Sequence, residues 1–464
     1  MRLTFVYLPQ EVCPIFFTEK IYKQNSREGA VLPPLGVAYL AAILEKNHVV
    51  KIVDANALRL SIGEIVDQLR IFKPDVLLFS LVTTNFQASL EWIKTIRKQI
   101  DVPVIVGGPQ PTVYPNETLA SDEIDFCVIG EGWETLPELV DCLDHKGNSQ
   151  NVQGIAFKKN GEVILTEKRQ SKVSIDDVPF PARHLLPNEK YTTILSKRFP
   201  ITAMMSSWGC PFHCVYCEHD PRVVLRDPVK VVDEMQECRT KYKIREIMFY
   251  DEIFSLDKKR VTIICQEIMS RKLDITWSIR TRADFVDEAL IKLLVKAGCI
   301  RINYGIESAD PQILRTAKRD VSLSSIIDAV KWAKREKMDV LGFFMLGLPG
   351  ESRQSILKTI ALTRELPFDY VQIIKFVPMP QTELYEKMKE KTGNDFWREY
   401  VLGRSKLKSF GSFDSNLTAD DLDDWLAKAY RSFYYRPSHI MRMLLKVKSF
   451  NELCGLVNSA LALR

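Results

Sequence analysis

Long apolar runs are missing from this sequence, and so is a strong excess of charge of one sign. No stretch reaches the ~18 consecutive apolar residues that a membrane-spanning helix needs. The apolar start Met1–Leu8 is short and is interrupted by Pro9, unlike a secretion signal. A net charge of +5 over 464 residues gives no reason to expect a nucleic-acid partner. We therefore expect a cytoplasmic protein of roughly two to four domains, each with its own apolar core.

A disulfide framework is excluded as well. Small secreted domains are stapled by dense disulfides, whereas ten cysteines in a chain of this size are few, and without a secretion signal they should stay reduced. Internal repeats and low-complexity segments are also absent. Three cysteines nevertheless stand together, at Cys210, Cys214 and Cys217. Their clustering needs a chemical explanation.

The first part of the chain alternates short apolar runs with amphipathic stretches. Near-continuous apolar strands separated by helices are typical of a parallel sheet covered on both faces. The spacing predicts a Rossmann-like, doubly wound α/β domain over residues 1–145. The expected strands are Leu3–Leu8, Val49–Asp54, Val76–Val82, Pro103–Gly108 and Phe126–Gly130, and the expected helices are Gly36–Lys46, Ser61–Phe72, Phe86–Gln99 and Thr135–Leu143.

Residues 146–200 are expected to form a hairpin and a linker. Gly154–Thr166 is a hairpin candidate because Asn160-Gly161 is a favoured two-residue turn, and the proline-rich Val178–Pro181 is typical of a connector.

A second series of alternating strands and helices follows over residues 201–383. Six units predict either an open α/β sheet or a partial (β/α)6 barrel, with the chemistry at the carboxyl ends of the strands. The expected strands are Ile201–Ser206, Glu246–Tyr250, Thr276–Arg280, Arg301–Ile306, Val340–Leu346 and Tyr370–Phe376. Residues 384–464 are expected to be mostly helical, with a helix N-cap at Leu417–Asp421.

The three cysteines follow the first strand of this second series with the spacing C-x3-C-x2-C. Gly209 and Pro211 favour a short irregular loop, which can present thiolates to an iron–sulfur cubane from several directions. Three cysteines leave one of four irons open to a further ligand. A structural zinc site that adds His213 or His219 is the alternative, because zinc takes four ligands.

With Tyr216 before the last cysteine, the segment resembles the signature of the radical S-adenosylmethionine (SAM) superfamily. The resemblance implies a [4Fe–4S] cluster on Cys210, Cys214 and Cys217, and SAM bound at the open iron with Tyr216 near its adenine. An electron from an external donor such as flavodoxin or ferredoxin would then cleave SAM to a 5′-deoxyadenosyl radical.

Polar residues at later strand ends extend this resemblance. Asp251 and Glu252 would hold the SAM amino group, although the family's more usual Gly-Gly-Glu is absent. Arg280 would pair with the SAM carboxylate through its planar fork. Glu307 and Ser308 would lie by the ribose and methionine. Strand-end caps and ordinary ion pairs are the alternative roles for these side chains.

Small and hydroxylated residues follow the strands of the front domain, where they let backbone amides approach a bulky anionic ligand. The pattern resembles the cobalamin-binding domain that precedes many radical SAM domains. The resemblance implies that cobalamin is bound by Ser80, Thr84, Gly107, Gly108, Pro109, Glu131 and Gly132. Because no histidine follows Asp54, a histidine ligand to cobalt is not expected there. A nucleotide-binding domain, or one that binds nothing, is the alternative.

The C-terminal segment Arg431–Lys448 separates apolar and basic side chains at helical spacing. This favours a helix packed on the barrel with a solvated basic face. Docking of Arg436, Arg442 and Lys446 on a membrane surface or an anionic partner is the alternative, and it would favour a lipid-like substrate.

These resemblances imply a cobalamin-dependent radical SAM enzyme that methylates an unactivated carbon of a small-molecule or lipid-like substrate. Oxidative cyclisation, ring contraction or another rearrangement without net methyl transfer is the alternative. A tRNA methylthiotransferase is disfavoured, because Cys13, Cys127 and Cys142 are too widely spread to hold a second cluster. A cobalamin or redox sensor without catalysis is a further class that the sequence leaves open.

Overall fold

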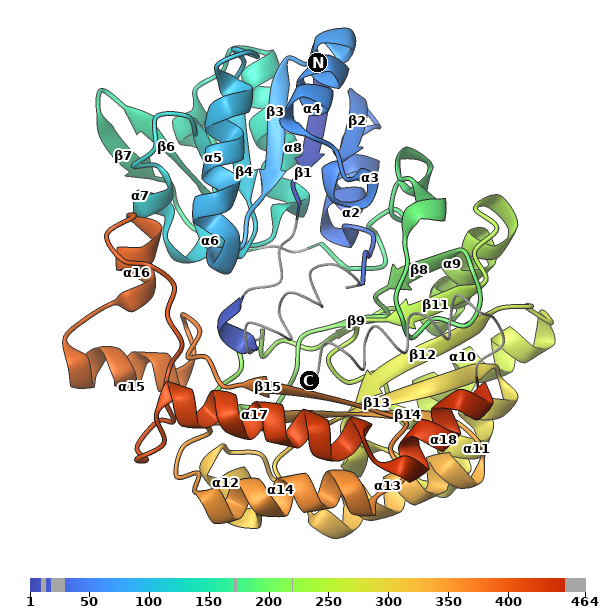
Figure 1. The fold of residues 1–464 in the computed structure, drawn as a ribbon. Coiled ribbons are helices and arrows are strands. Elements are labelled where there is room, and N and C mark those ends of the chain that lie inside the picture. The colour runs from blue at the N-terminus through green and yellow to red at the C-terminus, as the bar shows by residue number, and fades with distance from the viewer. Residues whose placement is uncertain (10–13, 18–29, 171–172, 219, 447–464) are drawn as a thin grey trace.

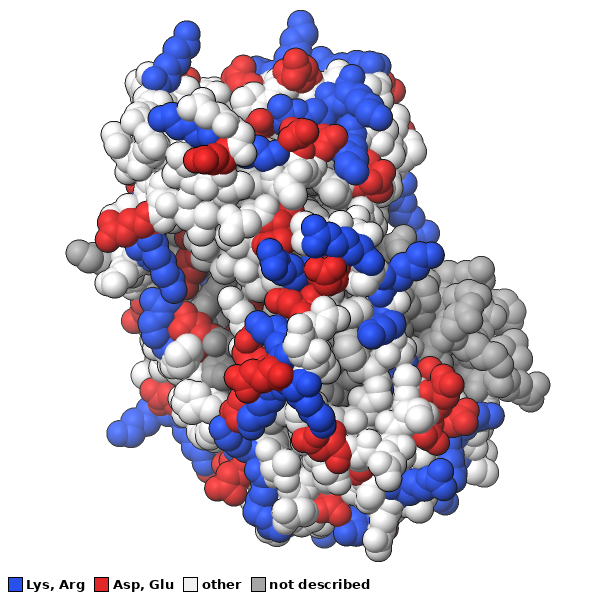
Figure 2. Space-filling model, turned by 90° about the vertical axis from the view of Figure 1, so that its left-hand side faces the viewer, with Lys and Arg blue, Asp and Glu red and all other residues white. Residues whose placement is uncertain are grey.

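The computed structural model describes residues 1–9, 14–17, 30–170, 173–218 and 220–446. The front domain and the barrel lie one above the other; α17 and α18 run along the barrel, and α16 reaches the front domain (Figure 1). None of the described helices is both long enough and apolar enough to cross a membrane. On the side that carries α15 and α16, acidic and basic side chains are interspersed without an extended patch of one sign (Figure 2).

The front domain contains a seven-stranded sheet with the order β2-β1-β3-β4-β5-β6-β7, of which the first five strands are parallel. Order 2-1-3-4-5 is that of flavodoxin-like doubly wound folds and confirms the predicted α/β class. The strands are β1 Arg2–Tyr7, β2 Val49–Asp54, β3 Val76–Ser80, β4 Val104–Gly107, β5 Phe126–Val128, β6 Ile155–Lys159 and β7 Glu162–Leu165.

Helices cover both faces of this sheet, with one apolar core on each face. Ile65 of α4 and Ile93 of α5 are buried in one core, and Ala38 of α2 and Leu139 of α8 in the other. The helices are α2 Leu35–Leu44, α3 Ala55–Leu58, α4 Ile62–Phe72, α5 Phe86–Arg97, α6 Pro109–Val113, α7 Pro115–Thr118 and α8 Gly132–Asp144.

The expected hairpin is confirmed and extends the front sheet. Asn160 and Gly161 both have positive φ, at 52° and 85°, as a type I′ turn requires. Strand β6 pairs antiparallel with β5, and β7 pairs antiparallel with β6. The hairpin therefore belongs to the front sheet and not to the linker alone.

The second sheet has six parallel strands in chain order, from β8 at one edge to β15 at the other, and confirms the predicted partial (β/α)6 barrel. Its strands are β8 Ile201–Met204, β11 Glu246–Phe249, β12 Thr276–Thr281, β13 Cys299–Glu307, β14 Asp339–Leu346 and β15 Tyr370–Lys375. The helices are α9 Pro228–Lys241, α10 Lys258–Ser270, α11 Glu288–Lys296, α12 Pro311–Thr316, α13 Leu323–Arg335 and α14 Arg353–Glu365.

A small two-stranded ribbon, β9 Ser207–Trp208 with β10 Val224–Leu225, is inserted after β8. Short 3₁₀ turns complete the connections, at Pro14–Phe16, Thr83–Asn85, Ser149–Asn151, Arg183–Leu185, Asn188–Lys190 and Ala283–Phe285.

The C-terminal region is helical, as predicted, and it joins the two domains (Figure 1). It consists of α15 Glu383–Thr392, α16 Phe396–Val401, α17 Ala419–Tyr434 and α18 Pro437–Lys446. Trp397 of α16 is fully buried in a core of the front domain. Helix α17 packs on β15, where the Tyr430 and Tyr434 hydroxyls bond to the backbone of Ile373 and Val371. Thr418 and Asp421 form the predicted cap of α17.

The predicted packing of the C-terminal segment on the barrel is confirmed, but a single helix with a solvated basic face is wrong. The helix breaks before Pro437, because proline lacks an N–H and disfavours helical backbone in the residue before it. Arg436 and Arg442 donate to the Arg364 and Phe368 carbonyls of the barrel domain. The exposed side chains of α18 include apolar Ile440, Met441 and Leu444. The Lys446 side chain, Val447 and Lys448 lie outside the described residues.

Candidate functional site

The three cysteines lie on a hairpin that the β9–β10 ribbon closes at its base. Gly209 opens the hairpin with φ +81°, and a Cβ there would lie 2.0 Å from the Arg222 carbonyl oxygen. Only glycine fits this close approach. The Cys210 N–H donates to the Asp220 carbonyl at 2.9 Å, and the Val215 N–H donates to Ala317 at 3.2 Å. The hairpin is therefore folded back on itself and anchored to the end of α12.

The three thiols share one electrostatic environment. Burial, followed by the neighbouring Cys214 and Cys210 thiols, raises the pKa of Cys217 to about 12, and burial also raises the pKa of Cys210. All three are free of disulfides. Across the described part of the chain, no group of three or more Cys, His, Asp or Glu side chains is placed to hold a metal ion. The cluster assignment therefore rests on the motif, and His219 of the zinc alternative lies outside the described residues.

Two buried arginines flank the thiols. The Arg282 guanidinium carbon lies 3.8 Å from the centre of the Phe212 ring, which belongs to the hairpin. Arg319 contacts the Tyr216 hydroxyl at 3.4 Å and interacts with Cys214. Nη1 of Arg282 and Nε of Arg319 are buried without a hydrogen-bond partner among the described residues. Positive N–H donors are thus left for a further acceptor at this site.

Beyond the hairpin, the predicted SAM residues fall into different environments. Tyr216 lies near Glu307, and burial, ahead of the Glu307 charge, raises its pKa well above the usual value. Glu307 ends β13 at φ +70°, 3.9 Å from Arg319. Ser308 is fully buried, and its hydroxyl lies 3.3 Å from Thr359. Tyr216 and Glu307 are therefore brought together beside the thiols.

Asp251 is fully buried, and both its carboxylate oxygens accept hydrogen bonds from Ser206 and Ser207. This is the strand-end cap that the sequence left as its alternative role. Glu252 is exposed and lies within electrostatic reach of Cys210. The Arg280 guanidinium stacks 3.9 Å above the Tyr250 ring and has no ion pair with any described carboxylate. Arg280 is therefore left without a described counter-charge.

Several predicted cobalamin residues meet at the carboxyl edge of the front sheet. Ser80 and Gly107 are neighbours in the register of β3 and β4. Gly108 has φ +97°, and a Cβ there would lie 2.8 Å from the Leu81 carbonyl oxygen. Pro109 starts α6 directly after it. The Thr84 carbonyl accepts a hydrogen bond from Tyr400 of α16 at 3.1 Å.

The remaining two, Glu131 and Gly132, lie where the front domain contacts the cysteine hairpin. Gly132 begins α8, and Glu131 forms an ion pair with Arg222 at 3.5 Å. Trp133 packs edge-on against Trp208 of β9, with ring centres 5.7 Å apart. These side chains line a small cavity of about 90 Å³. The loop predicted to bind cobalamin thus contacts the hairpin predicted to bind the cluster.

Comparison with known proteins agrees with this geometry. Residues 27–140 match the B12 binding domain family, and residues 205–363 match the Radical SAM superfamily. An uncharacterized methyltransferase of Pyrococcus horikoshii is 34% identical over 436 residues, which cover 91% of this chain and 92% of the relative. The chain belongs to the cobalamin-dependent radical SAM enzymes. Cobalamin, SAM and a [4Fe–4S] cluster are accordingly its cofactors.

Other relatives of the enzyme differ in the reactions that their names state. An anaerobic magnesium-protoporphyrin IX monomethyl ester cyclase of Rubrivivax gelatinosus is 27% identical over 433 residues, covering 90% of this chain and 76% of the relative. The radical SAM methyltransferase TsrM of Kitasatospora setae, solved with cobalamin and a [4Fe–4S] cluster, superposes with a TM-score of 0.68 at 17% identity. The alignment covers 84% of this chain and 78% of TsrM, and it shows the shared fold.

The residues present fit these cofactors. A cubane held by three thiolates is anionic, and the unpaired N–H groups of Arg282 and Arg319 are suited to its sulfur atoms. The close backbone approach at Gly108 and its neighbours suits a bulky ligand at the front sheet. Sequence reasoning missed Arg282 and Arg319, because neither belongs to the cysteine motif and only the fold brings them to it.

Proposed function

We propose that the enzyme methylates an unactivated carbon of a small-molecule or lipid-like substrate. The observation that carries the proposal is the similarity to the Pyrococcus horikoshii methyltransferase, because it extends over nearly the full length of both chains. A front domain in direct contact with the cysteine hairpin supports it further, since methyl transfer needs cobalamin and the radical site close together.

In this proposal Cys210, Cys214 and Cys217 would hold the cluster, whose chemistry when reduced would be the one-electron cleavage of SAM. Arg280, with no described carboxylate partner, would pair with the SAM carboxylate. Asp251 and Glu252, which follow β11, would lie at the SAM amino group. Tyr216 and Glu307 would bind the adenosine side.

The front loops would hold cobalamin. Ser80, Thr84, Gly107, Gly108 and Pro109 lie at one edge of the sheet, and Glu131 with Gly132 completes the set on the side of the hairpin. An external reductant such as flavodoxin or ferredoxin would supply the electrons. No contact with a membrane is part of the proposal, because Arg436 and Arg442 are engaged by the barrel domain.

Cyclisation or another rearrangement without methyl transfer is the second candidate, favoured by the similarity to the Rubrivivax cyclase. The two reactions consume SAM differently. Radical methylation uses two SAM molecules: one yields 5′-deoxyadenosine and methionine, and the other gives up its methyl group and leaves S-adenosylhomocysteine. A cyclase yields 5′-deoxyadenosine and methionine without S-adenosylhomocysteine.

The decisive experiment measures both SAM products. The purified enzyme is reconstituted anaerobically with iron and sulfide, with and without cobalamin, then reduced and given methyl-deuterated SAM. We expect S-adenosylhomocysteine only in the cobalamin-loaded sample, because in this proposal the methyl group of the second SAM would pass to cobalamin before it reaches the substrate. Deoxyadenosine without S-adenosylhomocysteine would favour the cyclase. One equivalent of zinc in place of iron would overturn both.

A further inference from the structure

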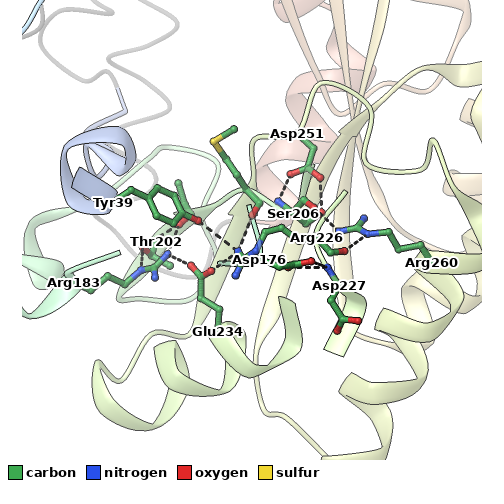
Figure 3. Close-up of polar contacts among 12 residues, drawn as sticks. Tyr39, Asp176, Arg183, Thr202, Ser206, Arg226, Asp227, Glu234, Asp251 and Arg260 are labelled. Atoms are coloured by element: carbon green, nitrogen blue, oxygen red, sulfur yellow. Dashed lines mark hydrogen bonds and ion pairs between the residues drawn. The ribbon is translucent and has the colours of Figure 1, made fainter. Parts of the chain in front are cut away.

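Both ends of the cysteine hairpin are tied to one network of buried charged side chains (Figure 3). Each of its members is at most 6% exposed, so bulk water does not solvate these charges and they depend on one another for compensation. The network consists of Arg183, Arg226, Glu234, Asp251 and Arg260. Of these five residues, only Asp251 was among the predicted cofactor residues, and none belongs to the cysteine motif.

The chain enters the hairpin through Ser206, whose polar atoms are all bound by this network. Its N–H and hydroxyl donate to Asp251 at 2.7 and 2.5 Å. Its carbonyl accepts from Arg260 Nη2 at 2.5 Å and from the Arg226 N–H at 3.0 Å. The backbone and the side chain of Ser206 are therefore held in place by Asp251, Arg260 and Arg226 together.

The chain leaves the hairpin through Arg226, directly after β10. The Arg226 carbonyl accepts from Arg260 Nε at 2.8 Å. Its guanidinium donates to the Met205 carbonyl at 3.0 Å and to Glu234 Oε2 at 2.5 Å. The same nitrogen lies 3.5 Å from the Tyr39 hydroxyl of the front domain. Arg226 therefore joins the two ends of the hairpin to each other and to α2.

Glu234 is the carboxylate on which this arrangement depends. It is fully buried on α9, and its second oxygen lies 2.7 Å from Nη2 of Arg183. Arg183 in turn donates to the Ala203 carbonyl of β8 at 2.9 Å. One carboxylate thus serves two buried arginines, and its loss leaves both without their counter-charge.

We propose that Glu234 is a positioning residue for the iron–sulfur cluster, acting through Arg226 on the base of the cysteine hairpin. The inference rests on the proposed role of the three cysteines as cluster ligands. A base held at both ends fixes where the thiolates lie, whereas a released Arg226 lets the ribbon separate from β8.

The test compares Glu234→Gln, which keeps the shape but removes the charge, with Glu237→Gln on the same helix. Glu237 pairs with Lys241 at the surface, 3.2 Å away. The first readout uses cluster-free protein and trypsin, which cuts after Arg222, a hairpin residue whose side chain is 63% exposed. We expect cleavage there to be about tenfold faster in Glu234→Gln, and unchanged in Glu237→Gln.

The second readout is iron per chain and the electron paramagnetic resonance (EPR) spectrum of the reduced cluster with and without SAM. In Glu234→Gln alone we expect loss of most of the iron, or a changed shift of the EPR signal when SAM is added.

Cleavage at Arg222 and cluster spectra equal to those of the wild type would overturn the inference. Equal acceleration at trypsin sites throughout the chain would also overturn it, because that is general destabilisation. If Glu234→Gln does not fold, Arg226→Lys keeps the positive charge but replaces Nη1, the nitrogen that bonds both Met205 and Glu234, with a shorter ammonium group, and the same two readouts apply. A wild-type protein that takes up no iron refutes the proposed function instead, while the trypsin readout still tests the hairpin.

Discussion

Arg282 places a buried guanidinium against the cysteine hairpin, with Nη1 unpaired among the described residues. A positive donor beside an iron–sulfur cluster favours the state with the added electron. We predict that Arg282→Gln lowers the midpoint potential of the cluster, measured by a redox titration followed by EPR. The exposed Arg315→Gln is the control and should leave the potential unchanged. A raised potential in Arg282→Gln would contradict the prediction.

Glu351 is a buried carboxyl in the loop after β14, where it accepts a hydrogen bond from the Gly347 N–H. Burial raises its pKa to about 8 from an ordinary 4.5. Because the folded state holds this proton to higher pH than the unfolded state, stability is lost as pH rises from about 4.5 to about 8. We predict that the unfolding midpoint falls less between pH 6 and pH 8 in Glu351→Gln than in the wild type. Glu390→Gln, at an exposed position, should behave like the wild type in the same thermal scans.

At the scale of elements, the strands were predictable because each is a short apolar run bounded by polar or turn residues. The β6–β7 hairpin of the front sheet was predictable from Asn160-Gly161, since only a few dipeptides suit a two-residue turn. The destination of α16 was not predictable. Its buried face, with Trp397 and Tyr400, contacts a domain that lies hundreds of residues earlier in the chain, and amphipathic periodicity does not name the partner of a buried face.

In the site, local motifs were predictable from the sequence, whereas contacts between distant segments were not. The cysteine spacing predicted a short irregular loop, which the structure shows closed into a hairpin by the β9–β10 ribbon. Asp251 is a cap because two serines of the neighbouring strand end reach its carboxylate. Arg226, Glu234 and Arg319 carry no local signal. Their roles follow from long-range contacts that the sequence does not encode locally.

Helix α16 connects the barrel to the front domain and is called here the inter-domain brace. The Trp397 side chain is fully buried, and its Nε1 donates to the Pro378 carbonyl at 2.8 Å. We predict that Trp397→Ala costs about 3–5 kcal/mol of unfolding free energy, from lost burial and the cavity left behind. Denaturant titration measures it. Arg398→Ala, which removes a surface ion pair with Glu117, should cost no more than about 1 kcal/mol. Equal losses of unfolding free energy in the two variants would contradict the role of Trp397 in joining the domains.

At the scale of the whole molecule, contacts among the described residues join the two domains at several separate places. Tyr39 meets Arg226, Trp133 meets Trp208, and α16 enters the core of the front domain. Contacts spread in this way make the domains unfold together, so that a ligand bound to one stabilises both. A domain pair held by a single mobile linker would instead melt in two steps.

Cobalamin provides the measurement of this coupling. We predict one calorimetric transition in the wild type, which moves upward as a whole when cobalamin is added, by about 2.7 kcal/mol in stability at a hundredfold excess over Kd. In Trp397→Ala the brace is weakened, and the transition should split so that cobalamin raises only the part that belongs to the front domain. Far-ultraviolet circular dichroism and tryptophan fluorescence, recorded in the same scans, should coincide in the wild type and diverge in the variant. Two transitions in the wild type, with only one moved by cobalamin, would show that the contacts at Tyr39 and Trp133 are too weak to couple the domains.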